Sequence, residues 1–146
     1  MSTTDHHEQV LLLASALRIE VCKLRRRLRE EAHIADVTPS QASVLSRLER
    51  DGPATASSLA RAEGMRPQSM AATVLALTDA QLVTGAPDPL DKRQTILSLT
   101  GHCRTLIKAS RAAREDWLAR TIESRLTMDE AMQLRQAMAL LKRLAD

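Results

Sequence analysis

The chain has 146 residues, a length typical of one domain, with 21 Lys and Arg against 18 Asp and Glu. It has no run of 18 apolar residues, no signal-peptide layout at its start and too few cysteines for a disulfide scaffold, which favours a protein of the reducing cytoplasm. Seventeen of the 21 cations are Arg, and Trp117 is the only aromatic residue, which argues against base-stacking platforms for single-stranded nucleic acid.

The first half of the chain is predicted to be helical, with breaks at Pro and Gly. Residues 1–7 are expected to form a flexible tail, and leucines at steps of three or four predict a helix from about Glu8 to Ile34. Thr38-Pro39-Ser40-Gln41 predicts a helix start, because Thr can cap it, Pro suits its first position and Gln can close a capping box. A short helix follows from about Thr55 and is broken by Gly64.

The second half is predicted to hold a hairpin among helices. Pro67 opens a helix, and the runs Leu82 to Ala86 and Arg93 to Leu99 predict two strands joined by a polar tip. Thr100 can cap a long helix to about Arg125, and a Thr-x-x-Glu capping box at Thr127 begins the last helix. The expected order is therefore four helices, a hairpin and two helices.

The stretch Ala56–Leu75 fits a helix-turn-helix, in which the second helix enters the major groove of DNA. Ala60 is small enough for the two helices to cross closely, and Gly64 suits a left-handed backbone at the turn. The hairpin that follows carries Asp91-Lys92-Arg93 at its tip. This combination predicts a winged helix, whose wing can place a cation in the minor groove, where the negative potential attracts Arg.

These features resemble the MarR (multiple antibiotic resistance regulator) family of bacterial transcription factors over residues 10–145. The resemblance is carried by Leu77-Thr78-Asp79-Ala80-Gln81-Leu82-Val83, Pro87-Asp88-Pro89, Asp91-Lys92-Arg93 and Leu97-Ser98-Leu99-Thr100. It implies an α+β, mainly helical fold in one compact domain. A winged helix-turn-helix DNA-binding lobe is expected at 35–99, and helices at 8–34 and 100–146 are expected to form a dimerisation region.

The resemblance implies a homodimeric regulator, in the role of a repressor, that binds pseudo-palindromic operator DNA and releases it when a small phenolic or anionic effector binds. No enzymatic activity is expected, because no Ser-His-Asp arrangement or Gly-rich phosphate loop appears in the sequence, and no cofactor or membrane partner is expected. Arg93 resembles the wing arginine of the minor groove, Asp91 the carboxylate that holds it, and Gln68 is placed to pair with adenine. The predicted DNA-binding residues lie on the wing, on the recognition helix or at helix N-termini suited to phosphates: Arg66, Pro67, Gln68, Ser69, Thr73, Asp91, Lys92, Arg93, Thr38, Ser40 and Thr55.

The chain departs from the family pattern at several positions. Ala71 and Ala72 stand where many members carry a hydroxyl and a basic residue, so contacts with base edges are expected mainly from Arg66 and Gln68. Gln81 and Cys103 stand where glycines are usual. Charge is also unevenly spread: residues 38–98 hold six cations and six anions, whereas residues 18–31 hold six cations and three anions. The run Arg25-Arg26-Arg27-Leu28-Arg29 is either a solvated helix face or a flank that touches phosphates.

Several alternatives stay open from the sequence. Leu13, Leu17 and Trp117 either line an effector pocket or belong to the core. A redox-responsive or zinc-responsive member of the same fold is a further reading. The candidates for redox sensing are Cys22 and Cys103. No metal is expected, and the candidates for a zinc site are Cys22, His33, His102 and Cys103. A different class of function is a helical dimerisation or adaptor protein whose winged helix binds protein, from which salt-dependent binding to duplex DNA would distinguish a regulator.

Overall fold

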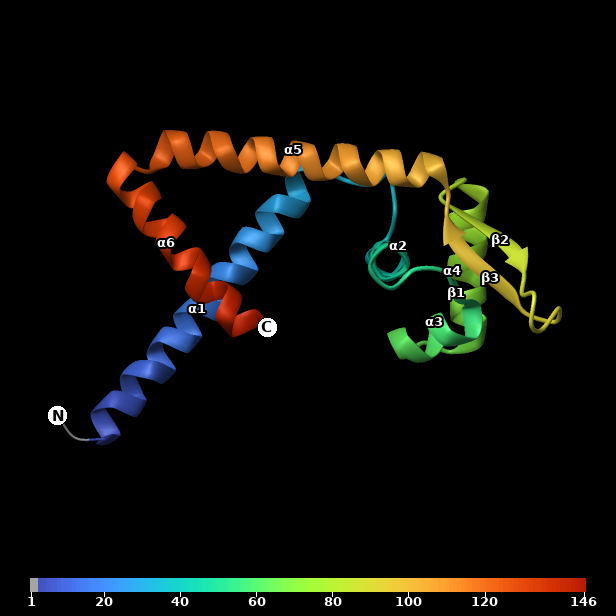
Figure 1. Ribbon diagram of the computed structural model, residues 1–146, viewed down its shortest axis with the longest axis horizontal. Helices are drawn as coiled ribbons and strands as arrows, with labels where there is room; N and C mark the ends of the chain where they lie inside the picture. The colour runs from blue at the N-terminus through green and yellow to red at the C-terminus, as the bar shows by residue number, and fades with distance from the viewer. Residues whose placement is uncertain (1–2) are drawn as a thin grey trace. The chain divides into compact units, whose positions relative to one another are not determined.

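The computed structural model describes residues 3–146 and contains six helices and three short strands in that range (Figure 1). The elements, in chain order, are α1 (Thr3–Glu31), α2 (Pro39–Asp51), β1 (Ala54–Thr55), α3 (Ala56–Glu63), α4 (Pro67–Asp79), β2 (Val83–Pro87), β3 (Thr95–Leu99), α5 (Gly101–Arg125) and α6 (Met128–Ala145). None of these helices is long and apolar enough to cross a bilayer. The chain forms two compact units, one of residues 33–111 and one that joins the described residues up to 32 with 112–146.

The capping boxes predicted at the N-termini of α2 and α6 are present in the structure. The Thr38 hydroxyl accepts a hydrogen bond from the Gln41 amide at 3.2 Å, and the Gln41 side chain accepts one from the Thr38 amide at 3.0 Å. Thr127 and Glu130 make the same reciprocal pair at the start of α6, with distances of 3.2 and 2.8 Å. Each box pairs backbone N–H groups that the helix cannot satisfy itself.

The helix-turn-helix consists of α3 and α4, which pack against each other in the 33–111 unit. Thr55 caps α3 by accepting a hydrogen bond from the Ser58 amide at 3.2 Å. Gly64 ends α3 in the left-handed region, at φ 63° and ψ 29°, as its residue type predicts. The turn is short, because Pro67 already begins the next helix.

A small antiparallel sheet follows, with the strand order β1-β3-β2 (Figure 1). In the hairpin, Val83 lies opposite Leu99, and Pro87 lies opposite Thr95. On the other side of β3, Ala54 pairs with Leu97. Leu97 and Leu99 are buried while Thr95 is exposed, so the hairpin rests on the core at its base and projects into solvent at its tip.

The hydrophobic core lies entirely within the 33–111 unit. Its fully buried large side chains come from every helix of the unit and from the turn before β2: Val44, Leu45, Leu59, Met70, Leu77, Leu82 and Cys103. Ile107 and Ser110 of α5 are buried as well, which is why the unit extends into that helix as far as residue 111.

The terminal helices are organised differently. No residue of α6 is buried, and no described residue of α1 is buried either. The unit is held in part by the Arg114 guanidinium, which donates a 2.9 Å hydrogen bond to the Ala32 carbonyl, and by the Arg27 guanidinium, which lies 5.4 Å from the centre of the Trp117 ring. Large apolar side chains of α1 and α6 remain exposed to solvent.

The structure differs from the sequence prediction in two places, the expected N-terminal tail and the strand β1. Residues 3–7 of the expected tail form the start of α1, where no Gly or Pro interrupts the helix and Asp5 favours the positive helix end; residues 1 and 2 lie outside the described range. The predicted DNA-binding lobe at 35–99 falls within the compact unit of residues 33–111. The strand β1 was not predicted, because two residues carry no periodicity.

Candidate nucleic-acid interface

The start of α4 presents polar side chains to solvent while its inner face anchors the helix. Arg66 has an extended backbone immediately before α4, and Gln68 and Ser69 are exposed in the first turn. Met70 and Leu77 are buried and fix the helix against the core. This first turn is therefore available to the edges of bases in a major groove.

Thr73 is more constrained than the sequence implied. Its hydroxyl donates a 3.0 Å hydrogen bond to the Ser69 carbonyl one turn earlier. The hydroxyl proton is therefore engaged, and only the oxygen lone pairs remain for a donor on DNA. Ala71 and Ala72, both exposed on the same helix, add no polar group.

The wing tip is a compact loop held by hydrogen bonds. The Asp91 carboxylate accepts bonds from the Arg93 amide at 3.1 Å and from the Arg93 Nε at 3.2 Å, and the Gln94 amide donates to the Asp91 carbonyl at 2.9 Å. Asp91 is half-buried, whereas the Arg93 side chain is 91% exposed. The carboxylate thus positions one edge of the guanidinium and leaves the rest of it free for a ligand.

A groove of about 570 Å³ separates α4 from the wing. It is lined by the start of α3 at Thr55 and Ser57, by the face of α4 that carries Leu75, and by the hairpin at Arg93 and Gln94. The structure therefore brings Thr55 and Arg93, which the sequence singled out separately, to one groove. Thr38 and Ser40 lie at the start of α2 and do not line it.

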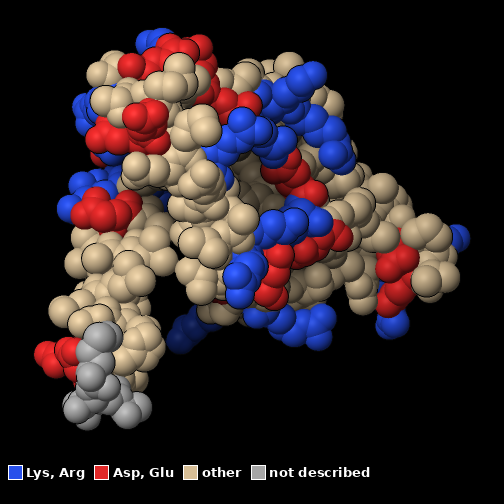
Figure 2. Space-filling view, turned by 60° about the vertical axis from the view of Figure 1, so that its left-hand side comes forward, with Lys and Arg blue, Asp and Glu red and all other residues tan. Residues whose placement is uncertain are grey.

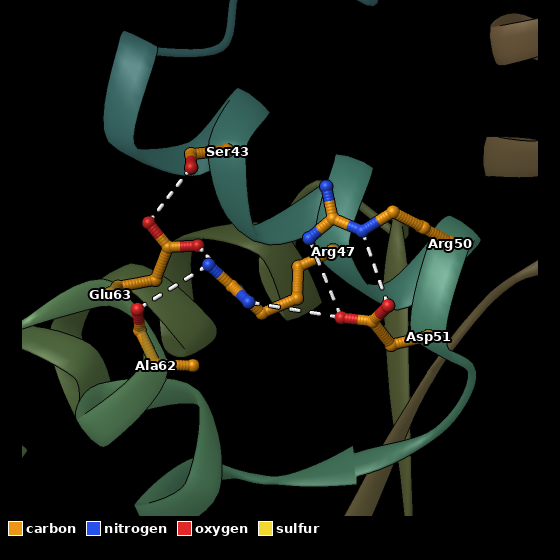
Figure 3. A network of polar contacts seen from close by, with 6 residues as sticks. All are labelled: Ser43, Arg47, Arg50, Asp51, Ala62 and Glu63. Carbon is orange, nitrogen blue, oxygen red and sulfur yellow. Dashed lines mark hydrogen bonds and ion pairs between the residues drawn. The ribbon is translucent and has the colours of Figure 1, made fainter. Parts of the chain in front are cut away.

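A polar network fixes α3 to α2 (Figure 3). The Glu63 carboxylate accepts hydrogen bonds from the Arg47 Nε at 2.7 Å and from the Ser43 hydroxyl at 2.8 Å, while Arg47 also donates to the Ala62 carbonyl at 3.3 Å. The hydrogen bonds from Arg47 and Ser43 hold the pKa of Glu63 below its ordinary value. The Glu63 side chain is only 14% exposed, so the network locks the first helix of the helix-turn-helix in place.

The positive charge available on this unit depends on where individual cations lie rather than on their number. Figure 2 shows Lys and Arg side chains interspersed with Asp and Glu side chains over the face that it displays. Several cations are paired, among them Arg47 with Glu63 and Arg111 with Glu49, both at 2.7 Å. An interface with DNA must therefore depend on the position of individual cations such as Arg93.

The other predicted site residues fall outside this arrangement. Leu13 is exposed and Leu17 and Trp117 are half-buried in the unit of terminal helices, and none of them lines the groove beside the wing. Cys22 is exposed, whereas burial of Cys103 in the core raises the pKa of its thiol. Among the described residues no three His, Cys, Asp or Glu side chains are grouped as metal ligands.

Two polar residues of the groove and one apolar residue of the wing tip were not among the predicted site residues. Ser57 and Gln94 line the groove, but a serine in a short helix and a glutamine beside a strand give no signal before the fold is known. Leu90 is 96% exposed at the wing tip. The signal for Leu90 was present in the sequence, since it is an apolar residue inside the polar turn Asp88-Pro89-Leu90-Asp91.

Comparison with known proteins agrees with this architecture. Residues 37–95 match the MarR family. An HTH-type transcriptional regulator of Mycobacterium tuberculosis (strain CDC 1551 / Oshkosh) is 38% identical over 134 residues, which covers 92% of this chain and 93% of the relative.

Two solved structures extend the comparison. A transcriptional regulator protein from Pseudomonas aeruginosa PA01 is 38% identical, with a TM-score of 0.77, over 94% of this chain and 96% of that one. An S. aureus MepR mutant bound to an oligodeoxyribonucleotide shares the fold at 19% identity, with a TM-score of 0.68, over 92% of this chain and 98% of that one. The fold and these relatives identify transcriptional regulators rather than enzymes, and the chain belongs to the MarR family of HTH-type, DNA-binding regulators.

Proposed function

We propose that the protein is a dimeric repressor that binds a pseudo-palindromic operator. The start of α4 reads base edges in the major groove, and Arg93 of the wing enters the adjacent minor groove. In a dimer the two half-sites lie about one helical turn apart. The phosphates between the two grooves lie along the start of α3, where backbone N–H groups attract anions.

The observation that carries this proposal is the geometry of Arg93. Its side chain is 91% exposed at the end of a projecting hairpin, yet Asp91 fixes its direction. A cation that is both exposed and positioned loses little conformational entropy when it enters a narrow groove. Arg93 also lines the same groove as the start of α3, so one duplex can contact both.

The exposed apolar faces of the terminal helices support the homodimer. In α1 these residues are Val10, Leu11, Leu12, Leu13, Ile19, Val21 and Leu24, and in α6 they are Met128, Met132, Leu134, Met138, Leu140 and Leu144. An apolar surface of this extent is normally covered by another protein surface. In a two-fold homodimer the same surface of each copy meets the other, so the helices of a second copy would cover these apolar faces.

Release of DNA by a small phenolic or anionic effector is proposed on the family alone, with Leu13, Leu17 and Trp117 as the candidate lining. Because effector binding must favour a state that binds DNA poorly, an effector should weaken operator binding without competing for the wing. Screening small phenols and carboxylates for release of a bound duplex tests this part separately.

The experiment that tests the DNA-binding mechanism is selection of duplexes from a random-sequence pool, followed by titration at several salt concentrations. We expect a two-fold-related consensus, nanomolar affinity and a steep loss of affinity as salt rises. Arg93→Ala should weaken binding more than tenfold. It should also reduce the slope of log affinity against log salt concentration by about 1, because one cation that lies near the phosphates is lost.

The matched control is Arg135→Ala, which removes an exposed arginine from α6 and should leave operator affinity unchanged. An Arg93→Ala variant that binds the selected duplex as tightly as the wild type would remove the wing from the mechanism. Absence of salt-dependent binding to any selected duplex would overturn the proposed function as a whole and favour an adaptor that binds protein.

A further inference from the structure

The most exposed large apolar residue of the described chain lies at the tip of the wing. Leu90 is 96% exposed, more than any apolar side chain on the terminal helices, and it contributes nothing to the core. A single exposed leucine needs no explanation in general. Its position two residues before Lys92 and three before Arg93, on the hairpin proposed to enter a minor groove, gives this one a specific context.

The tip that carries Leu90 is held by several hydrogen bonds within the loop. The Asp88 carboxylate accepts a 2.9 Å hydrogen bond from the Leu90 amide, just as Asp91 accepts one from Arg93. The Asp88 amide in turn donates to the Gln94 carbonyl at 2.9 Å and closes the base of the loop. Pro89 restricts the backbone between them. The backbones of Leu90 and Arg93 are therefore each fixed by a carboxylate-stabilised turn of the same loop.

A minor groove offers an apolar side chain a suitable surface. Its walls are formed by deoxyribose C–H groups, and proteins commonly press leucine or other apolar residues into it. The floor differs between base pairs, because a G·C pair adds the guanine amino group whereas an A·T pair presents only acceptors. An apolar side chain pressed onto the floor displaces water from that amino group without replacing its hydrogen bond, which disfavours G·C.

We propose that Leu90 contacts the minor groove beside Arg93 and selects A·T pairs at the position that it covers. The inference rests on the proposed function, since it requires the wing to bind DNA. Leu90 acts through apolar contact and releases no counterion, whereas Arg93 acts through charge. The two residues therefore predict different responses to salt and to base composition.

The test compares Leu90→Asn, which has nearly the same size but is polar, with Leu90→Met, which stays apolar. Duplexes are selected from a random pool by each protein, and affinities are measured on the selected duplex with A·T or G·C pairs at the outer flanks. We expect the wild type and Leu90→Met to select A·T flanks. Leu90→Asn should select the same central half-sites with relaxed flanks and bind the A·T-flanked duplex roughly fivefold more weakly.

Two further readouts separate Leu90 from Arg93 and from the fold. Leu90→Asn should keep the wild-type salt slope and bind the G·C-flanked duplex as the wild type does, whereas Arg93→Ala should weaken binding to both duplexes and lower the slope. All variants should melt at the wild-type temperature, because both side chains are exposed.

The inference fails on its own if the wild type binds its selected duplex as proposed but Leu90→Asn selects the same flanks with the same affinity. It also fails if Leu90→Asn weakens binding equally on both flanks, because that loss would not reflect base selection. A wild type without salt-dependent duplex binding removes the proposed function and this inference together, so the two failures are distinguishable.

Discussion

At the scale of single residues, Gly64 and Gln81 occupy equivalent positions after the two helices of the helix-turn-helix. After α3, the Met65 amide donates to the Ala60 carbonyl at 2.9 Å; after α4, the Leu82 amide donates to the Leu77 carbonyl at the same distance. Both are the six-to-one hydrogen bond of a Schellman motif, which needs a left-handed residue. Gly64 has φ 63°, and Gln81 has φ 59°.

Gln81 therefore carries backbone strain that a glycine would not, and it stands where the family usually has glycine. Gln81→Gly should raise the free energy of unfolding by roughly 1 kcal/mol, because the left-handed conformation is costly for a residue with a Cβ. The Gln81 carbonyl, which accepts a 2.6 Å hydrogen bond from the Thr100 hydroxyl, is retained in the variant. Urea denaturation measures the change.

Gln81→Ala is the matched control, since it removes the glutamine side chain but keeps the Cβ, and its stability should stay close to that of the wild type. If Gln81→Gly is less stable than Gln81→Ala, the strain at this turn is smaller than the extra entropy that glycine gains in the unfolded chain.

At the scale of elements, much of the fold follows from local chemistry. The capping boxes at Thr38 and Thr127 and the break at Gly64 depend on residues close in sequence, so they could be predicted. The strand β1 could not, because it exists only through pairing with β3. The contact of Glu63 with Arg47 spans 16 residues, and nothing in the charge pattern selects this pair from the other acids and bases nearby.

The candidate site also has parts that could be predicted from the sequence and parts that could not. Asp91 and Arg93 form a local pair two residues apart, which the family resemblance indicated. That Thr55 and Arg93 share a groove depends on how α3, α4 and the hairpin pack, which no local signal encodes. The exposure of Leu90 depends on where the hairpin leaves the core.

The network between α2 and α3 should stabilise the lobe in a pH-dependent way. Because the pKa of Glu63 is lowered by folding from its ordinary 4.5, its contribution is fully present above about pH 4.5 and is lost as pH falls through the folded value. Glu63→Gln should lower the free energy of unfolding by about 1 kcal/mol at pH 7, since Arg47 and Ser43 lose a charged acceptor in a largely buried place.

The difference between wild type and Glu63→Gln should shrink as the pH falls from about 4.5 through the folded pKa of Glu63, which chemical denaturation from pH 7 to pH 3 measures. Glu20→Gln is the matched control, because its pair with Lys23 is mostly exposed and should contribute little. A wild-type advantage that persists undiminished at pH 3 would contradict the assignment to the Glu63 carboxylate.

At the scale of the whole molecule, buried side chains are distributed unequally between the two units. The unit of residues 33–111 holds the core, whereas α6 contains no buried residue. Helices without a buried face gain little stability from the chain to which they belong, because most helical stability in proteins comes from packing of an apolar face. We therefore expect the terminal helices to gain stability from the second copy in the proposed dimer.

The double variant Leu12→Glu with Leu140→Glu should convert the dimer to a monomer at micromolar concentration, since it places charges on the exposed apolar faces of α1 and α6. Sedimentation velocity measures the change. Leu90→Glu is the control, because it places one such charge on an exposed leucine of the other unit and should leave the dimer intact. A wild-type chain that sediments as a stable monomer would contradict the dimer itself.

The lone indole, stacked under the Arg27 guanidinium, makes the protein convenient for spectroscopy. With no Tyr or Phe in the chain, all intrinsic fluorescence arises from Trp117 and reports on the unit of terminal helices alone. The unit proposed to bind DNA is optically silent in the near ultraviolet. A single denaturation followed by both emission and far-ultraviolet ellipticity therefore compares the melting of the terminal helices with that of all helices, without any label.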